Sequence, residues 1–344
     1  MPRIPHQQLI ELVTQTFAKA GTPPAHAEIV SNHLVTSNLA GHDSHGVMRI
    51  VQYLAAIRSG EIDPQARPSV LSDSPSGASL AGNRAFGQIA GYDCMLLAIE
   101  KAREMGVAAV TVSNCYHSGR IGTYAEQATD AEMIGIILVN AGGGGQWVAP
   151  FGGAAGRLGT NPIAIGAPST GAFPILLDIA TSVAPEGKVR DCRNRGKQVP
   201  EGWILDTQGQ PTTDPNDLYE PAPGGSLQPL GGSAGHKGFG LAVMIDILAG
   251  GLSGAGCCRA EEVAASDGIT MLAMNIEKFA AADAYYEQVK ALVEHLKSCP
   301  PAPGFKEVLV PGEHEFRCRE QQLAEGIEVD EVTWSALQEA APAS

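Results

Sequence analysis

Short apolar segments in the middle of the chain, each next to a helix-like segment or a glycine-rich turn, most constrain its fold. Residues 107–112, 133–139 and 269–276 are almost uniformly apolar, as expected of strands buried on both faces. Helical spacing over residues 89–105 and 123–129 precedes the first two of these strands. Two further strands are expected at residues 162–165 and 174–179. This alternation predicts a mixed α/β (α+β) fold.

Helix-like segments occupy both ends of the chain. Apolar residues recur at helical spacing over residues 5–21, 24–39, 47–54 and 332–339. We therefore predict a helical cap formed by residues 1–75 and completed by residues 300–344, packed on an α/β domain of residues 76–299.

The segments between these elements have less regular patterns. Residues 63–77 are rich in Pro, Ser and Gly, and residues 185–232 are polar and turn-rich. Residues 237–252 predict a buried helix entered through glycines, and residues 279–296 predict a long amphipathic helix.

Composition excludes several classes of protein. The 344 residues are 44% hydrophobic, as in a folded globular protein, and the net charge of -14 comes without a basic cluster for nucleic acid. No run of about 18 apolar residues could span a membrane, and residues 1–8 lack a signal-peptide core. The expectation is a cytoplasmic protein with neither nucleic-acid nor membrane partners.

The seven cysteines have no spacing typical of a metal site. They are predicted to be reduced and mostly structural. Only Cys115 lies beside a candidate site.

The first candidate site is the segment from Gly41 to Arg49, at the junction of two helices. If a helix begins at Ser44, which is a suitable N-cap, His45 and Arg49 lie one turn apart on the same face. This arrangement would place a proton-exchanging imidazole beside a guanidinium that can bind a carboxylate. An ordinary helix cap with solvated side chains is the alternative.

Two other chemistries were considered for the same segment. His42 and His45 could bind a metal, but no Cys or carboxylate stands at a confirming spacing, so no metal is expected. Ser44 could be a nucleophile, but the G-x-S-x-G turn that exposes such a serine is absent.

The second candidate site is the polar segment around His117, between a predicted strand and a predicted helix. The positive end of a helix dipole would favour a neutral imidazole here. A neutral His117 could act as a base or orient a ligand, and a plain polar turn is the alternative.

Glycine-rich loops form a third group. They cover residues 142–145, 152–153, 158–162, 178–182 and 235–240. Such loops can offer backbone amides to phosphate, and Lys237 at a helix start would add positive charge. Neither the Rossmann G-x-G-x-x-G fingerprint nor a P-loop is present, and connecting turns are the alternative.

The combined pattern resembles the type-2 malate/L-lactate dehydrogenase family, which also includes ureidoglycolate dehydrogenase, sulfolactate dehydrogenase, diketogulonate reductase and the piperideine/pyrroline-2-carboxylate reductases. The resemblance is carried by residues 41–49, 83–88, 114–125, 148–162, 178–188, 199–203, 212–215, 229–240 and 311–313. It implies a non-Rossmann NAD(P)-binding fold of the sulfolactate/malate dehydrogenase-like type, in which residues 76–299 form the cofactor-binding domain.

The resemblance also implies roles for individual residues. The family's Ser-His-Gly motif falls on Ser44, His45 and Gly46, so that His45 would donate or accept the proton with Ser44 beside it in a relay. Arg49 would hold the substrate carboxylate. His117 would be a base or a cofactor contact.

The cofactor implied is NAD or NADP. The residues carried over to its surroundings are Thr160, Asn161, Asp178, Ala180, Thr181, Ser182, Lys237, Gly238, Gly312 and Glu313. Asp178 could instead assist the catalytic histidine. Arg190, Arg193 and Arg195 lie in a region that could reach a 2′-phosphate, and solvated side chains are the alternative. The implied assembly is a homodimer with its site near the subunit interface. The glycine run 142–145 is richer in glycine than this family's pattern.

The function implied is an NAD(P)-dependent oxidoreductase that transfers a hydride between nicotinamide and a malate- or lactate-like 2-hydroxy/2-oxo acid. Reduction of a cyclic 2-imino acid at the same site is one alternative. Two alternatives of other classes are a hydrolase or lyase that uses Ser44 and a non-catalytic small-molecule binding protein.

Overall fold

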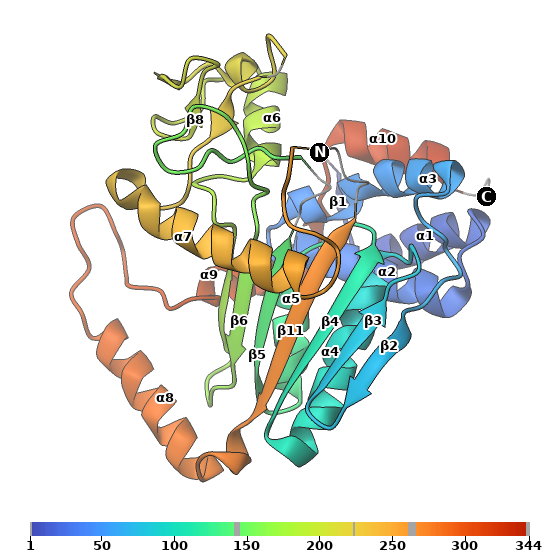
Figure 1. Cartoon of the computed structure of the whole chain (residues 1–344), viewed down its shortest axis with the longest axis vertical. Helices are drawn as coiled ribbons and strands as arrows, with labels where there is room; N and C mark the ends of the chain where they lie inside the picture. The colour runs from blue at the N-terminus through green and yellow to red at the C-terminus, as the bar shows by residue number, and fades with distance from the viewer. Residues whose placement is uncertain (1, 141–144, 223, 261–265, 342–344) are drawn as a thin grey trace.

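A seven-stranded mixed sheet forms the centre of the protein in the computed structural model, which describes residues 2–140, 145–222, 224–260 and 266–341 (Figure 1). In spatial order the strands are β2 (Ser69–Ser74), β3 (Gly77–Ala81), β4 (Val107–Cys115), β11 (Asp267–Asn275), β5 (Met133–Asn140), β6 (Ile163–Ala167) and β7 (Ile175–Ile179). Strands β3 and β4 are parallel, and the other neighbouring pairs are antiparallel. The predicted mixed α/β fold is confirmed.

The middle of the sheet is covered on both faces. In β11, Met271 pairs with Val110 of β4 and with Ile137 of β5, and all three side chains are fully buried. Helices α4 (Gly87–Met105) and α5 (Gly122–Asp130) pack on one face. Helix α7 (Gly235–Ile245) and the π-helical turn η5 (Asp246–Gly251) cover part of the other (Figure 1). Burial on both faces explains why these strands are apolar without alternation.

The ends of the chain meet in a helical cap, as the sequence predicted. It contains α1 (His6–Lys19), α2 (Pro24–Leu39), α3 (Ile50–Ser59) and α10 (Glu331–Ala340), and β1 (Arg3–Ile4) pairs with β12 (Ile327–Glu328). Their apolar side chains share one buried cluster, in which Phe17 of α1 packs edge-on against Phe86 before α4. The exact division into residues 1–75 with 300–344 and residues 76–299 stays a prediction.

The turn-rich segment of residues 185–232 contains more regular structure than its sequence suggested. It forms α6 (Glu186–Asn194) and a small sheet of β8 (Ile204–Leu205), β9 (Pro211–Thr212) and β10 (Ser226–Leu227). The segment has its own apolar cluster, which includes Val189, Ile204 and Leu227. Two 3-10 turns, η3 (Pro215–Leu218) and η4 (Gly232–Ala234), lie in or directly after this segment. A further one, η6 (Ile276–Lys278), follows β11.

Two amphipathic elements leave apolar side chains exposed. The sequence predicted that the helix of residues 237–252 is buried, but only its inner face, with Ala242, Ile245 and Ala249, packs in the core. Its outer apolar residues are Met244, Ile247, Leu248 and Leu252. Helix α8 (Ala282–Lys297) has no buried residue and extends away from the sheet before α9 (Glu313–Glu325) returns to it (Figure 1). In the described part of the chain, no helix is long and apolar enough to cross a membrane.

Candidate active site

The segment from Gly41 to Arg49 does not form the helix that its sequence predicted. Two 3-10 turns, η1 (Asp43–His45) and η2 (Val47–Arg49), are separated by Gly46 in an extended conformation, and α3 begins only at Ile50. The prediction that His45 and Arg49 share one face of a helix capped by Ser44 is therefore wrong.

Asn38 of α2 explains this break in the helix. Its side-chain oxygen accepts the Val47 amide at 2.8 Å, and its amide donates to Asp43 at 2.6 Å. A side chain at position 46 would overlap Asn38, so that only glycine fits there. The Asn38 side chain thus replaces the helical hydrogen bonds that the turn lacks.

The structure nevertheless brings the predicted site residues together. The rings of His45 and His117 are stacked, with centroids 5.5 Å apart and planes at 15°. Ser44 Oγ lies 3.0 Å from His45 Nδ1. Arg49 donates from Nε to the Ser44 carbonyl oxygen at 2.6 Å. Two imidazoles and one guanidinium therefore occupy one junction between the cap and the loop after β4.

Both imidazoles are held in the neutral form. Burial, and then the charge of Arg49, lowers the pKa of His45 to about 3. Burial, Arg49 and His45 lower the pKa of His117 well below its usual value. A neutral His117 was predicted from a helix dipole, but the residue lies in a loop five positions before α5, so that burial is the main cause.

Helix α3 and the loop after β4 supply polar residues that the sequence did not single out. Gln52 accepts from Arg49 Nη1 at 2.7 Å and donates to the Tyr116 hydroxyl at 3.2 Å. Tyr53 lies 2.7 Å from His117 Nδ1, and Gln88 of α4 donates to the Tyr53 hydroxyl at 2.7 Å. Tyr53 lies within the apolar stripe of α3. Its hydroxyl, which needs a hydrogen-bond partner when buried, was the only feature of the sequence that could have pointed to a role at the site.

Helix α6 begins beside the same junction. A Cβ placed on Gly187 would be 3.7 Å from Ser44 Cβ and 4.0 Å from Nη2 of Arg190. Arg190 forms an ion pair with Glu186 at 3.2 Å, and its charge contributes to lowering the pKa of Arg49. Gly187 therefore lies next to both Ser44 and the Arg190 guanidinium, and the charge of Arg190 acts on Arg49.

Arg193, the next arginine of α6, is bound elsewhere. It donates to Asn216 at 3.0 Å and to Glu220 at 2.6 Å, and it lies over the Tyr219 ring. Its guanidinium is thus engaged within the small-sheet region.

Several residues predicted to surround the cofactor are tied into the fold. Thr181 donates to the carbonyl oxygens of Thr160 and Asn161 at 3.0 and 2.9 Å. The Asn161 amide donates to Ala242 in α7 and to Asp246 in η5, both at 3.1 Å. These side chains fix the loop before β6 against α7, and they shape the surface there rather than offer free polar groups.

Asp178, Ala180 and Ser182 line the end of β7. Asp178 accepts the amide of Gly122 at 2.8 Å and lies 3.6 Å from Nε of Arg120. It is bonded to these groups rather than to either imidazole. Ala180 is half-buried, and Ser182 donates to the Ala184 carbonyl oxygen at 2.8 Å.

Glu313, at the start of α9, is buried in an ion-pair cluster. Lys297 lies 2.6 Å from its carboxylate, Arg317 lies 2.5 Å from it, and the Val310 amide donates to it. Gly312 has a positive φ of 87° and packs against Leu176 of β7. In this chain the two residues anchor the returning arm to the sheet.

Lys237 differs from these residues because it is exposed in the first turn of α7. Gly238 packs so closely on Leu230 that a Cβ would overlap its carbonyl oxygen, whereas the Gly240 side faces open space. A helix start with an exposed ammonium and an open glycine side suits a bound phosphate group.

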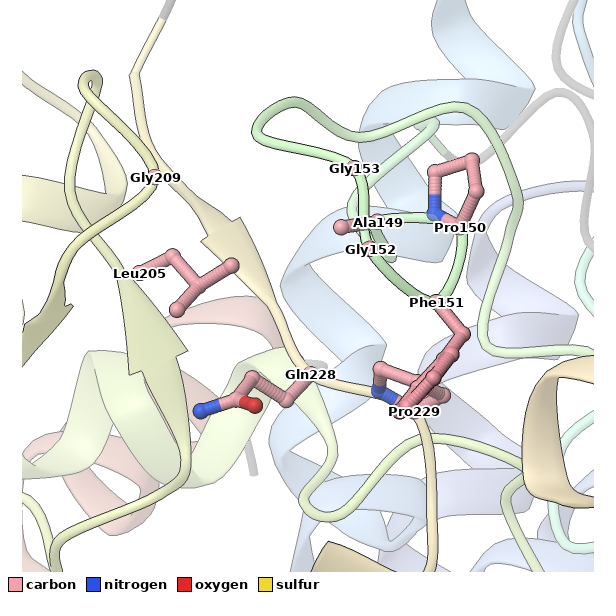
Figure 2. A pocket seen from close by; sticks show the side chains of 9 residues that line it. All are labelled: Ala149, Pro150, Phe151, Gly152, Gly153, Leu205, Gly209, Gln228 and Pro229. Carbon is pink, nitrogen blue, oxygen red and sulfur yellow. The ribbon is translucent and has the colours of Figure 1, made fainter. Parts of the chain in front are cut away.

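A cavity of about 220 Å³ lies beside this helix start (Figure 2). The ring of Phe151, in the wall of this cavity, lies against the His236 ring of α7, with the two ring centroids 5.6 Å apart. The complete lining is Ala149, Pro150, Phe151, Gly152, Gly153, Leu205, Gly209, Gln228 and Pro229. None of these lining side chains is titratable, so that this cavity can bind a ligand but offers no acid or base of its own.

The remaining predictions concern metal, thiols and the glycine run. Among the described residues, no group of three or more His, Cys, Asp or Glu side chains is placed to hold a metal. All seven cysteines are free thiols, and burial raises the pKa of Cys115 well above its usual value. Within the glycine run 142–145, residues 142–144 lie outside the described residues.

Comparison with known proteins identifies the class of enzyme. The chain is 39% identical to the malate dehydrogenase of Pyrococcus abyssi, over 98% of this chain and 94% of the relative. Its fold matches the crystal structure of malate dehydrogenase from Entamoeba histolytica with a TM-score of 0.94, at 32% identity, over 98% of this chain and 97% of that one. It also matches the Δ1-piperideine-2-carboxylate reductase of Pseudomonas syringae with a TM-score of 0.83, at 29% identity, over 99% and 100% of the two chains.

The protein is therefore an oxidoreductase of the hydroxy-acid dehydrogenase class. Residues 4–338 match the malate/L-lactate dehydrogenase family, and the chain belongs to that family. Its members use nicotinamide cofactors. The predicted family and enzyme class are confirmed, and the hydrolase, lyase and non-catalytic alternatives lose their support.

Proposed function

We propose that the protein is an NAD(P)-dependent oxidoreductase that interconverts a 2-hydroxy acid and a 2-oxo acid at the junction of His45, His117 and Arg49. The observation that carries this proposal is the stacked pair of neutral imidazoles beside a guanidinium. Oxidation of an alcohol requires a base, and reduction of a ketone requires a proton donor. Arg49 positions the acid by its carboxylate.

His45 exchanges a proton with the oxygen on C2 of the acid, and Ser44 holds the imidazole at Nδ1. Because its pKa is low, His45 is a free base at neutral pH, ready to accept the proton during oxidation. The negatively charged acid bound to Arg49 favours its protonated form during reduction. When bound, the nicotinamide supplies or accepts the hydride at C2.

The cofactor would be held by Lys237 and the start of α7, which suit the pyrophosphate. Gly238 lets the start of α7 pack closely on the backbone of Leu230. Thr160, Asn161 and the segment 178–182 form the adjoining surface, while Gly312 and Glu313 support it from the returning arm. This chain fits such a cofactor because its exposed ammonium and the open side of Gly240 lie together on α7.

The preferred substrate would carry a second acid group, as malate does. Arg190 supports this choice, since its guanidinium lies next to Gly187, which in turn lies next to Ser44, and its charge acts on Arg49. Glu186 already pairs with Arg190 at 3.2 Å, and a second acid group of the substrate would add another negative charge near the two guanidiniums. Reduction of a cyclic 2-imino acid is the second candidate, favoured by the structural match to a piperideine-carboxylate reductase.

We propose further that two copies of the chain form a homodimer. The exposed apolar residues of α7 and η5 lie further along the helical segment that begins beside Lys237, and α8 has no buried residue. Exposed apolar faces of this kind typically mark an interface. Light scattering on the purified protein should give twice the chain mass of 35.8 kDa, and Ile247→Glu should shift it toward the monomer mass.

The proposal is tested by following the near-ultraviolet absorbance of reduced nicotinamide. NADH and NADPH would each be supplied with oxaloacetate, pyruvate and piperideine-2-carboxylate. The proposal predicts substrate-dependent oxidation of at least one cofactor with a 2-oxo acid. Turnover of the imino acid alone would favour the second candidate, and no turnover with any of them would contradict both.

A further inference from the structure

The two histidines of the site are held by different partners. The His117 Nδ1 atom lies 2.7 Å from the Tyr53 hydroxyl, which receives the Gln88 amide, also at 2.7 Å. Tyr53 is fully buried and Gln88 is 1% exposed. His45 instead meets the hydroxyl of Ser44, in a half-buried turn.

We propose that Tyr53 and Gln88 fix His117 in the neutral tautomer that carries its proton on Nε2. His117 then donates a hydrogen bond to the substrate oxygen, and His45 alone exchanges the proton. This inference rests on the proposed function, because it divides the work of the same site between its two imidazoles.

The direction of the hydrogen bonds carries the argument. A tyrosine hydroxyl has a single hydrogen, and its oxygen accepts from Gln88. Because Tyr53 is fully buried, its hydroxyl hydrogen needs an acceptor, and among the described residues His117 Nδ1 is the acceptor within reach. The Tyr53 hydrogen is therefore donated to Nδ1, which accepts it with a lone pair. A neutral imidazole has one N–H, so that the proton of His117 resides on Nε2.

Burial keeps each member of this chain in the required state. It raises the pKa of Tyr53 far above the working pH, so that the hydroxyl keeps its hydrogen. It lowers the pKa of His117, so that Nδ1 stays unprotonated. The close approach of Gly87 to the backbone of Tyr116 and His117, where a Cβ would overlap their carbonyl oxygens, holds Gln88 next to the loop.

His45 has the opposite property. A serine hydroxyl both donates and accepts, so that Ser44 can satisfy Nδ1 whether that nitrogen carries a proton or not. In the reduction, the N–H bond of protonated His45 breaks and its electron pair stays on the ring. C2 would receive a hydride, that is, a hydrogen with two electrons, from a reduced nicotinamide, and the π bond between C2 and its oxygen would break. The electron pair released to the oxygen forms the O–H bond of the 2-hydroxy acid with the proton from His45, and His117 keeps its own proton.

Long-range 1H–15N correlation spectra of histidine-labelled protein report the tautomer directly. His117, assigned with the His117→Gln variant, should show a protonated Nε2 and a bare Nδ1 between pH 6 and 9, a range set by the direction of its pKa shift. In Tyr53→Phe this fixed tautomer should be lost. A protonated Nδ1 in the wild type, or an unchanged spectrum in Tyr53→Phe, would overturn the proposal.

Tyr124→Phe is the matched control. Tyr124 is equally buried and donates to the Ser118 carbonyl oxygen at 2.6 Å, so that the variant loses a comparable hydrogen bond away from Nδ1. It should lose similar stability and keep the His117 tautomer. Loss of the tautomer in this control as well would show a general effect of loosened packing, and would contradict the specific role of Tyr53.

Kinetics separate the two roles. A glutamine at position 117 keeps an N–H donor that does not titrate, so that His117→Gln should lower kcat by roughly 10²-fold and keep the pH dependence of kcat/KM. His45→Gln should remove that pH dependence. If His117→Gln removes it instead, the proposal fails, whereas absence of nicotinamide-linked turnover in the wild type would refute the proposed function itself.

Discussion

Two polar clusters of this protein have opposite uses, and the first is half-buried whereas the second is buried. In the first, His45, His117 and Arg49 meet between the cap and the sheet. In the second, Asp246 of η5 accepts the amides of Asn140 at 2.7 Å and Asn161 at 3.1 Å on one oxygen, and the Cys258 amide at 2.9 Å on the other. The second cluster binds three chain segments together, whereas the first presents nitrogens able to change their protonation.

The difference shows that burial alone does not identify a reactive group. Asp246 has fixed donors on both oxygens, and these donors would lose their acceptor if the side chain were removed. The imidazole of His45 has a partner, Ser44, that tolerates either tautomer. Groups whose neighbours accept more than one state can take part in a reaction, and groups whose neighbours require one state hold the fold.

The largest expected effect is on activity at the first cluster. His45→Gln should reduce kcat roughly 10²- to 10⁴-fold, because the general acid–base is lost. Cofactor affinity, measured by quenching of tryptophan fluorescence, should change little, since the residues proposed to hold it lie elsewhere. A variant that keeps the wild-type kcat would remove His45 from the chemistry.

The second cluster should respond in stability instead. Asp246→Ala leaves two buried N–H donors and one partly buried N–H donor without this acceptor, and should lower the free energy of unfolding by about 3 kcal/mol. Urea denaturation followed by circular dichroism gives this value. Ser253→Ala, on the chain beyond η5, is a control that removes a donor and leaves Asp246 intact, with an expected cost of about 1 kcal/mol. Equal losses in the two variants would contradict the special importance of Asp246.

The pH dependence of stability gives a further test. Burial lowers the pKa of His33 and His45 from 6.5 to about 3. Their contribution to stability is therefore complete above pH 6.5 and declines as the pH falls from 6.5 toward 3, by about 1.4 kcal/mol per pH unit for each imidazole. The urea midpoint should be lower at pH 5 than at pH 7, and this decrease should be smaller in His33→Gln.

Asp267 acts in the opposite direction over part of that range. Burial raises its pKa from 3.8 to about 6, so that its contribution is present below pH 3.8 and is lost as the pH rises through 6. His117, whose pKa is also lowered, acts with His33 and His45, and the net trend should follow these three imidazoles. A urea midpoint that is higher at pH 5 than at pH 7 would show that the histidines are not held neutral.

The smallest expected effect concerns the choice of acid. Arg190→Gln should lower kcat/KM for oxaloacetate about tenfold, which corresponds to one charge-assisted contact, and leave pyruvate nearly unchanged. Arg193→Gln is the matched control on the same helix, since its guanidinium binds Glu220 and Asn216. Equal effects on both acids would assign Arg190 a general electrostatic role.

Much of the architecture could be predicted because periodicity reports burial. The helix of residues 24–39 was predicted with the bounds Pro24–Leu39, and the apolar segments became β4, β5 and β11. Strand β2 was missed because it is exposed along its whole length and its sequence lacks an apolar pattern. Strand β3 pairs with it and consists mostly of small residues. The break at Gly46 was missed because it depends on Asn38, which lies on another helix.

The site was predictable only in part for the same reason. His45, Arg49 and His117 stand in polar motifs that a reader of the sequence notices. Tyr53 and Gln88 gain their importance from a contact between α3, α4 and a loop, and no local pattern reveals it. Asn161 and Thr181 were predicted beside the cofactor, but their hydrogen bonds to α7 and to the loop before β6 became visible only in three dimensions.

Isotope transfer tests the central claim most directly. A reduced nicotinamide carrying deuterium on the transferred position of C4 would be oxidised by the wild-type protein with a 2-oxo acid, and the product analysed by mass spectrometry and NMR. We predict a 2-hydroxy acid with one deuterium on C2. A product with hydrogen from solvent at C2, or consumption of the 2-oxo acid without oxidation of the cofactor, would contradict it.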